Sequence, residues 1–128
     1  MAIDWEETSR GLKGVPKLRK FVSSFRERLG FWPVLYGGHH IREARDFQKG
    51  DPVMGKCPLW YIRIDDGMTP ATLDFPRETW TDFALWQFAT DKASRARPYP
   101  RDVLHGADFS LFQGTQADLH TAWPFRAA

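Results

Sequence analysis

Hydrophobic and polar residues alternate or recur along this chain in patterns that predict short strands and a few helices. Residues 2–6 (AIDWE) alternate apolar and acidic side chains, which is the period of a strand. From Leu18 to Leu29 the apolar residues recur at helical spacing, and Pro16 and Gly30 flank them. This second segment is therefore predicted to be an amphipathic helix that ends at the glycine.

The remaining apolar runs predict four more strands and two short helices. The strands are expected at 32–36, 59–64, 83–90 and 106–109, and the helices at 41–49 and 115–123. The stretch 65–82 contains one glycine and two prolines and is predicted to be mostly loop. The first elements alternate between strand and helix, which implies a parallel sheet. We therefore predict an α/β fold and a single domain over residues 1–128.

Length and charge narrow the classes of protein. A complete (β/α)8 barrel needs about 250 residues, so 128 residues can form only part of one. The 18 Lys and Arg against 16 Asp and Glu give a net charge of +2, too small to indicate nucleic-acid binding. Residues 92–101 are basic and interrupted by prolines, which favours a solvated loop over a polyanion contact.

No targeting, membrane or metal-binding pattern is recognised. The first residues lack the pattern of a signal peptide, no apolar run is long enough to span a membrane, and the cellular location stays open. Cys57 is the single cysteine, and a buried structural thiol is expected there. His39 and His40 have no partners at ligand spacing, so we expect loop histidines, no metal site and no cofactor.

Carboxylates and an amide near predicted strand ends are the candidates for chemistry. Asp4 and Glu6 are two residues apart in a strand and face the same side, about 6.6 Å apart at Cα. Repulsion between them can keep one protonated, as glycoside hydrolysis requires. Gln87 faces away from Trp86 and would point into a site if that tryptophan packs outward. Asp108 is either a third site carboxylate or a turn residue.

Aromatic residues near the same strand ends suggest sugar binding. The chain holds 6 Trp, 10 Phe and 3 Tyr, and flat rings match the faces of pyranose sugars. Tyr36, Trp60, Tyr61 and Trp86 are the candidates for a stacking wall, and core packing is the alternative for each ring.

Five motifs in order resemble the C-terminal part of glycoside hydrolase family 25, the Chalaropsis-type lysozymes or N-acetylmuramidases. They are 2–6 (AIDWE), 32–37 (WPVLYG), 58–60 (PLW), 85–88 (LWQF) and 106–114 (GADFSLFQG). In the family these lie on barrel strands four to eight of a modified barrel. The resemblance implies a partial TIM-like barrel without the first three strand–helix units.

The resemblance also implies an activity and a role for each matching residue. The family hydrolyses the β-1,4 bond between N-acetylmuramic acid and N-acetylglucosamine in peptidoglycan, without a metal or cofactor. Glu6 matches the general acid, and Asp4 and Asp108 match its acidic partners. Tyr36, Trp60 and Gln87 match substrate-binding positions. Attack by the 2-acetamido group of the sugar and direct attack by water both stay open.

Departures from the family pattern leave other interpretations. Ser110 stands where Asn is usual, and Arg63 enters a strand that is usually more apolar. The aspartate of the family's first strand has no counterpart here, so this chain alone is expected to have little activity. A non-catalytic glycan-binding or assembly module is the alternative, and an unrelated small α+β binding protein is a third. Open sheet edges would also favour self-association.

Overall fold

A computed structural model of the chain describes residues 1–6, 14–90 and 108–127, and it contains one five-stranded sheet. The strands are β1 (Ala2–Asp4), β2 (Val34–Gly37), β3 (Leu59–Ile62), β4 (Leu85–Ala89) and β5 (Phe109–Leu111). They lie in the order of the sequence, with β1 to β4 parallel and β5 antiparallel to β4. The predicted parallel sheet is thus confirmed for four strands and wrong for the fifth.

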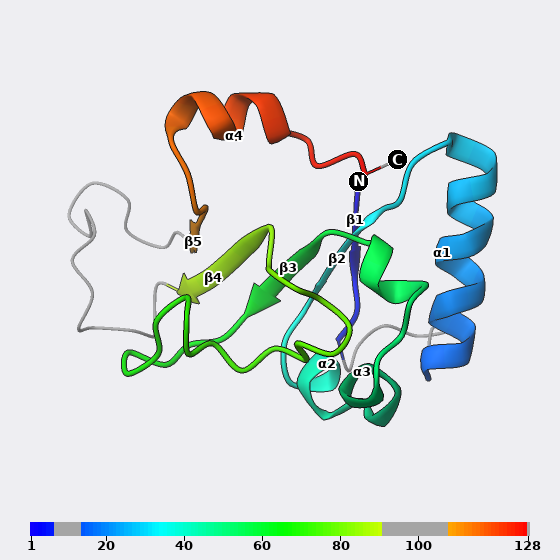
Figure 1. The fold of residues 1–128 in the computed structure, drawn as a ribbon, viewed down its shortest axis with the longest axis horizontal. Coiled ribbons are helices and arrows are strands. Elements are labelled where there is room, and N and C mark those ends of the chain that lie inside the picture. Colours follow the sequence, from blue (N-terminus) through cyan, green and yellow to red (C-terminus); the bar gives the residue numbers. More distant parts are fainter. Residues whose placement is uncertain (7–13, 91–107, 128) are drawn as a thin grey trace.

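The longest helix lies along one side of the sheet, and the shorter ones lie towards its two ends (Figure 1). They are α1 (Val15–Leu29), α2 (His39–Glu43), α3 (Arg45–Lys49) and α4 (Gln116–Ala122), with a 3-10 turn, η1, at Met54–Lys56. In Figure 1, α2 and α3 lie near the carboxyl ends of β1 and β2, and α4 lies at the opposite end of the molecule. None of the described helices is long and apolar enough to cross a membrane.

Helix α1 forms where the apolar spacing predicted it. Leu18, Val22 and Phe25 are buried, and Gly30 ends the helix with a φ of 82°, a conformation that favours glycine. The apolar stripe is narrower than the pattern suggested, because Phe21 is 44% exposed and Leu29 is 55% exposed. The helix therefore contributes one buried row of side chains to the core.

The segment 41–49 does not form the single helix that was predicted. Ala44 has an extended backbone, with φ −67° and ψ 116°, and it separates α2 from α3. Ile41 and Phe47 on either side are both fully buried, so the break lets both side chains reach the core. The amino end of α4 follows its prediction, since Thr115 and Asp118 form a capping box.

The loop between β3 and β4 contributes buried apolar side chains to the core, which a helix would contribute in a regular barrel. Leu73, Phe75, Trp80 and Phe83 lie in this connection and are all buried in the main apolar cluster. The predicted absence of a helix from 65 to 82 is confirmed. Cys57 is also buried, as predicted, and burial raises the pKa of its thiol to about 12. The predicted basic loop at 92–101 lies outside the described residues.

Asp51 joins three segments that the sequence separates widely. Its Oδ2 accepts hydrogen bonds from Arg19 Nε at 3.0 Å and Nη2 at 2.6 Å, and its Oδ1 accepts from the backbone N–H groups of Val53 and Met54. Its own N–H donates to Thr79 Oγ1 at 3.0 Å. Burial favours the protonated form, but the hydrogen bonds from Arg19 and the two amides outweigh it and lower the pKa of Asp51.

We expect Asp51→Asn to destabilise the fold by about 2–3 kcal/mol at pH 7, because the variant loses a charge-assisted contact to Arg19. A carboxyl group whose pKa is lowered by folding stabilises the folded state at pH values above its unfolded pKa of about 3.9. That stabilisation is lost as the pH falls through the pKa that the group has in the folded protein. The difference between wild type and variant in urea unfolding should therefore shrink below about pH 4.

Asp46→Asn is the matched control for this prediction. Asp46 contacts the same guanidinium at 3.6 Å, but its side chain is 49% exposed. Its loss should cost less than about 1 kcal/mol. Equal losses for the two variants, or a pH-independent loss for Asp51→Asn, would contradict the account of Asp51.

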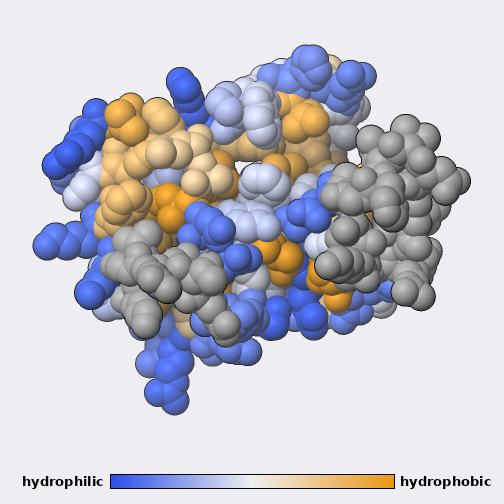
Figure 2. Space-filling model, turned by 180° about the vertical axis from the view of Figure 1, so that it is seen from behind, coloured by the Kyte–Doolittle hydropathy of each residue, from blue (hydrophilic) through white to orange (hydrophobic). Residues whose placement is uncertain are grey.

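The two outer strands leave edges that we expect to promote self-association. Within the described residues β1 pairs only with β2, and β5 pairs only with β4. Apolar residues also lie exposed between hydrophilic ones on the rear face (Figure 2). Unpaired edges and exposed apolar surface both favour association. Sedimentation of the purified chain should show concentration-dependent oligomers, whereas a monomer at every concentration would contradict the prediction.

Candidate functional site

The carboxyl ends of the parallel strands bring most of the predicted site residues together. Asp4 ends β1, Tyr36 and Trp60 lie within β2 and β3, and Gln87 lies within β4. Asp108 lies one residue before β5 and is exposed, so the predicted position of this residue within a strand is wrong. Because β5 is antiparallel, its amino end meets the carboxyl end of β4, and Asp108 still reaches this edge.

A pocket of about 240 Å³ collects five of the predicted site residues. Its lining consists of Ala2, Asp4, Tyr36, Trp60, Gln87 and Asp108. The register explains the grouping, since Asp4 pairs with Tyr36 and Tyr36 pairs with Trp60 on neighbouring strands. Side chains at paired positions point to the same face of a sheet. We call this the central pocket.

The aromatic and amide side chains of the central pocket hold one another in place. Tyr36 Oη donates to Gln87 Oε1 at 2.9 Å, which gives this buried amide a partner. The rings of Tyr36 and Trp60 meet edge to face with centroids 5.0 Å apart. Trp60 Nε1 donates to Ser110 Oγ at 3.0 Å, so the serine that departs from the family pattern fixes the indole. The pocket thus has an ordered aromatic wall.

Three carboxylates act on Tyr36. Burial raises the pKa of the Tyr36 hydroxyl, and the negative charges of Glu6, Asp4 and Asp108 raise it further. All three acids predicted to carry chemistry are therefore within electrostatic reach of a single hydroxyl.

Glu6 lines a second, larger pocket beside the central one. The pocket measures about 520 Å³ and is lined by Glu6, Gly38, His39, His40, Arg42, Ile62, Arg63 and Ile64. Burial raises the pKa of Glu6, the charge of Asp4 raises it further, and His39 and His40 lower it in part. The net direction is upward, which extends the protonated form of this carboxyl towards neutral pH. We call this the arginine-lined pocket.

Two predicted wall residues do not face the central pocket. Tyr61 is fully buried, and its hydroxyl contacts Asp74 at 2.9 Å and Arg42 at 3.2 Å. Trp86 is 1% exposed, and its Nε1 donates to the Arg63 carbonyl at 2.8 Å. Both are core residues, because neighbours along a strand point to opposite faces and Trp60 and Gln87 take the pocket side. Core packing, the alternative for these two rings, is what the structure shows, and the condition for Gln87 to reach the pocket is met.

Residues around Glu6 were not expected in the site. His39, His40 and Arg42 lie on α2, which follows directly on β2, and Arg63 follows β3. One indication of them was present in the sequence, which is Arg63, a charged residue at a strand position where the family usually has an apolar one. Within the described residues, no group of His, Cys, Asp and Glu has the geometry to hold a metal ion.

Comparisons with known proteins identify the fold. No protein-family model matches the sequence, and no curated protein matches it in sequence. Among solved structures, a muramidase from Acremonium alcalophilum has a TM-score of 0.60 at 23% identity, over 94% of this chain and 53% of the other. A family GH25 lysozyme from Aspergillus fumigatus has a TM-score of 0.58 at 20% identity, over 94% of this chain and 53% of the other.

A third structure agrees with these two. A muramidase from Trichobolus zukalii has a TM-score of 0.58 at 22% identity and covers 92% of this chain and 52% of the other. The chain therefore has the fold of part of a GH25 lysozyme barrel, as the motifs implied. It spans about half the length of each of these solved structures.

Proposed function

We propose that this chain carries acidic and glycan-binding residues of a peptidoglycan muramidase. The observation that supports this most strongly is the central pocket, where Asp4 and Asp108 line one cavity with Tyr36, Trp60 and Gln87. These residues come from five different strands or strand ends. The fold shared with two muramidases and a GH25 lysozyme also supports this proposal.

Glu6 is proposed as the general acid. Burial and the neighbouring Asp4 raise its pKa, so it can hold a proton and deliver it to the glycosidic oxygen as the bond breaks. Asp4, together with Asp108, would stabilise the positive charge that develops at the anomeric carbon.

Tyr36, Trp60 and Gln87 are proposed to bind the sugars. The rings provide flat apolar faces, and the Gln87 amide provides polar atoms for hydroxyl or acetamido groups. Their mutual contacts fix them before the substrate arrives, which lowers the entropy cost of binding.

Purified peptidoglycan tests the proposal. The chain should bind it, and the chain within a complete barrel should release reducing ends from it. Binding without hydrolysis by the complete barrel would favour a non-catalytic glycan-binding module instead. If neither the chain alone nor the complete barrel binds the glycan, both the muramidase and the glycan-binding function are ruled out.

Truncation of the aromatic wall should weaken binding strongly. We expect Trp60→Ala to lower the affinity for peptide-free glycan strands at least about tenfold, because the variant loses the face that stacks on a sugar. Trp123→Ala is the control, since Trp123 is 61% exposed and does not line the central pocket. Co-sedimentation with purified glycan would compare the two, and equal affinities would contradict the assignment of Trp60.

A further inference from the structure

Two arginines line the arginine-lined pocket together with Glu6. Among the described residues its lining holds Arg42, Arg63 and two histidines, with Glu6 as the one acidic side chain. The side chains of Arg42 and Arg63 are 29% and 28% exposed, so both guanidinium groups are accessible yet partly shielded from water. Partial burial strengthens the attraction of such groups for an anion.

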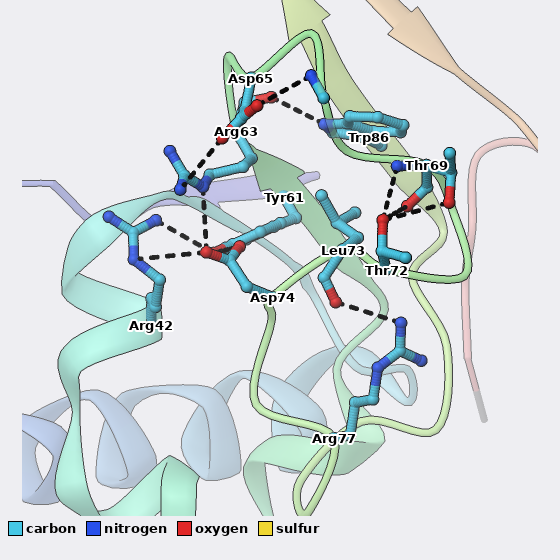
Figure 3. Close-up of polar contacts among 11 residues, drawn as sticks. Arg42, Tyr61, Arg63, Asp65, Thr69, Thr72, Leu73, Asp74, Arg77 and Trp86 are labelled. Atoms are coloured by element: carbon cyan, nitrogen blue, oxygen red, sulfur yellow. Dashed lines mark hydrogen bonds and ion pairs between the residues drawn. The ribbon is translucent and has the colours of Figure 1, made fainter.

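One carboxylate, that of Asp74, contacts both arginines and orients them (Figure 3). Arg63 Nε donates to Asp74 Oδ2 at 3.0 Å, and Arg42 Nε lies 3.9 Å from the same oxygen. Asp74 Oδ1 accepts a hydrogen bond from the buried Tyr61 hydroxyl at 2.9 Å, which fixes the carboxylate in turn. Neither Asp74 nor Tyr61 belongs to the pocket lining, so this carboxylate and this hydroxyl hold the arginines from outside it.

The remaining contacts leave donors for a ligand. Arg42 Nη1 donates to Tyr61 Oη at 3.2 Å, and Arg63 Nη2 lies 3.6 Å from Asp65 Oδ2. Among the described residues, Arg42 Nη2 and Arg63 Nη1 take part in no hydrogen bond or ion pair. Two guanidinium groups fixed in this way are suited to a carboxylate, which accepts charge-assisted hydrogen bonds.

The pocket lies beside the reacting end of the site. Glu6 lines the arginine-lined pocket, and Asp4, two residues earlier on the same strand, lines the central pocket. A glycan bound in the central pocket would therefore continue past Glu6 towards the arginines. In peptidoglycan every second sugar is a muramic acid with a lactyl ether, whose carboxyl group is either free or joined to a peptide.

We propose that the arginine-lined pocket binds a carboxylate carried by the muramic acid residue and so positions that sugar beside Glu6. This inference rests on the proposed function, because it assumes that the central pocket holds the neighbouring sugar. The carboxylate comes from the lactyl group itself or from the attached peptide. Arg42 and Arg63 are thus specificity-determining residues that distinguish peptidoglycan from glycans of N-acetylglucosamine alone.

Calorimetric binding of three probes to the full chain tests the proposal. The probes are a chitin tetrasaccharide, a peptide-free tetrasaccharide of alternating N-acetylglucosamine and N-acetylmuramic acid, and the same tetrasaccharide with its peptides. Chitin should bind at least about tenfold more weakly than the better of the two muramic acid probes. Tight binding of the peptide-free probe identifies the lactyl carboxylate, and tight binding of the peptide-bearing probe alone identifies a peptide carboxylate.

Variants separate the arginines from the rest of the site. Arg42→Gln and Arg63→Gln should each reduce binding of the muramic acid probe about tenfold and leave chitin binding unchanged. If Arg63→Gln does not fold, Arg63→Lys replaces it, because lysine keeps the positive charge. This variant should still lose part of the preference for the muramic acid probe over chitin. Arg45→Gln is the control, because Arg45 is an exposed arginine of α3 outside both pockets.

The outcomes distinguish the two proposals. Equal binding of chitin and both muramic acid probes, or no effect of either arginine, would overturn the carboxylate subsite and leave glycan binding intact. Failure of the wild-type chain to bind any of the three probes would overturn the proposed function and this inference with it.

Discussion

Glu6→Gln should abolish hydrolysis of peptidoglycan, lowering the rate about 10²- to 10⁴-fold when the chain is part of a complete barrel. Glutamine keeps the size of the side chain but has no acidic proton to give to the leaving oxygen. The loss of turbidity of purified cell walls measures the rate. Because glutamine can still form hydrogen bonds, binding of the glycan should change little.

The pH dependence gives a second test of the same residue. Burial and Asp4 raise the pKa of Glu6, so its acid form persists to higher pH than that of an ordinary glutamate. Activity should fall as the pH rises through this pKa. Asp46→Asn is a suitable control, because Asp46 is exposed and lies outside the lining of both pockets. Activity of Glu6→Gln within threefold of wild type would remove Glu6 from the role of general acid.

Trp86→Ala should have the largest effect on stability, about 3–5 kcal/mol in urea unfolding. Trp86 is 1% exposed and its ring meets Phe83 and Phe88 at centroid distances of 6.4 and 6.1 Å. Removing the indole leaves a cavity under β4, and it also takes the donor from the Arg63 carbonyl. Trp86→Phe keeps most of the ring volume and should lose about half as much.

Trp123→Ala provides the comparison. Trp123 is 61% exposed, so its removal should cost less than about 1 kcal/mol. A similar loss for Trp86→Ala and Trp123→Ala would mean that β4 does not pack as described. It would also undermine the orientation of Gln87, which follows from that packing.

Patterns that depend on local spacing predicted the structure best. The spacing of Leu18, Val22 and Phe25 predicted α1. The strand period placed Asp4 on the opposite side from the buried Ile3, but β1 ends at Asp4 and Glu6 lies beyond it. The motif order indicated that Tyr36, Trp60 and Gln87 would share a site, because parallel strands end at one edge. The central pocket contains all three.

Features that depend on tertiary packing escaped prediction. The antiparallel direction of β5 depends on how the chain returns to the edge of β4, and the three residues of this strand carry too little pattern to reveal it. Tyr61 was predicted to bind sugar because it is aromatic. An aromatic residue type does not reveal that the loop containing Asp74 covers this side of β3. The arginine-lined pocket was missed because α2 and the end of β3 meet only in the folded chain.

The most direct test of the central claim is an NMR titration of the tryptophan indole signals with peptide-free muramic acid tetrasaccharide. It would be run at a concentration where sedimentation shows one species, with a Trp60→Phe variant to assign the signal. We predict that the Trp60 signal shifts on binding, whereas Trp80 and Trp86, which are buried and donate to the Cys57 and Arg63 carbonyls, stay unchanged. An unchanged Trp60 signal at saturating tetrasaccharide, or a shift confined to Trp123, would contradict the account.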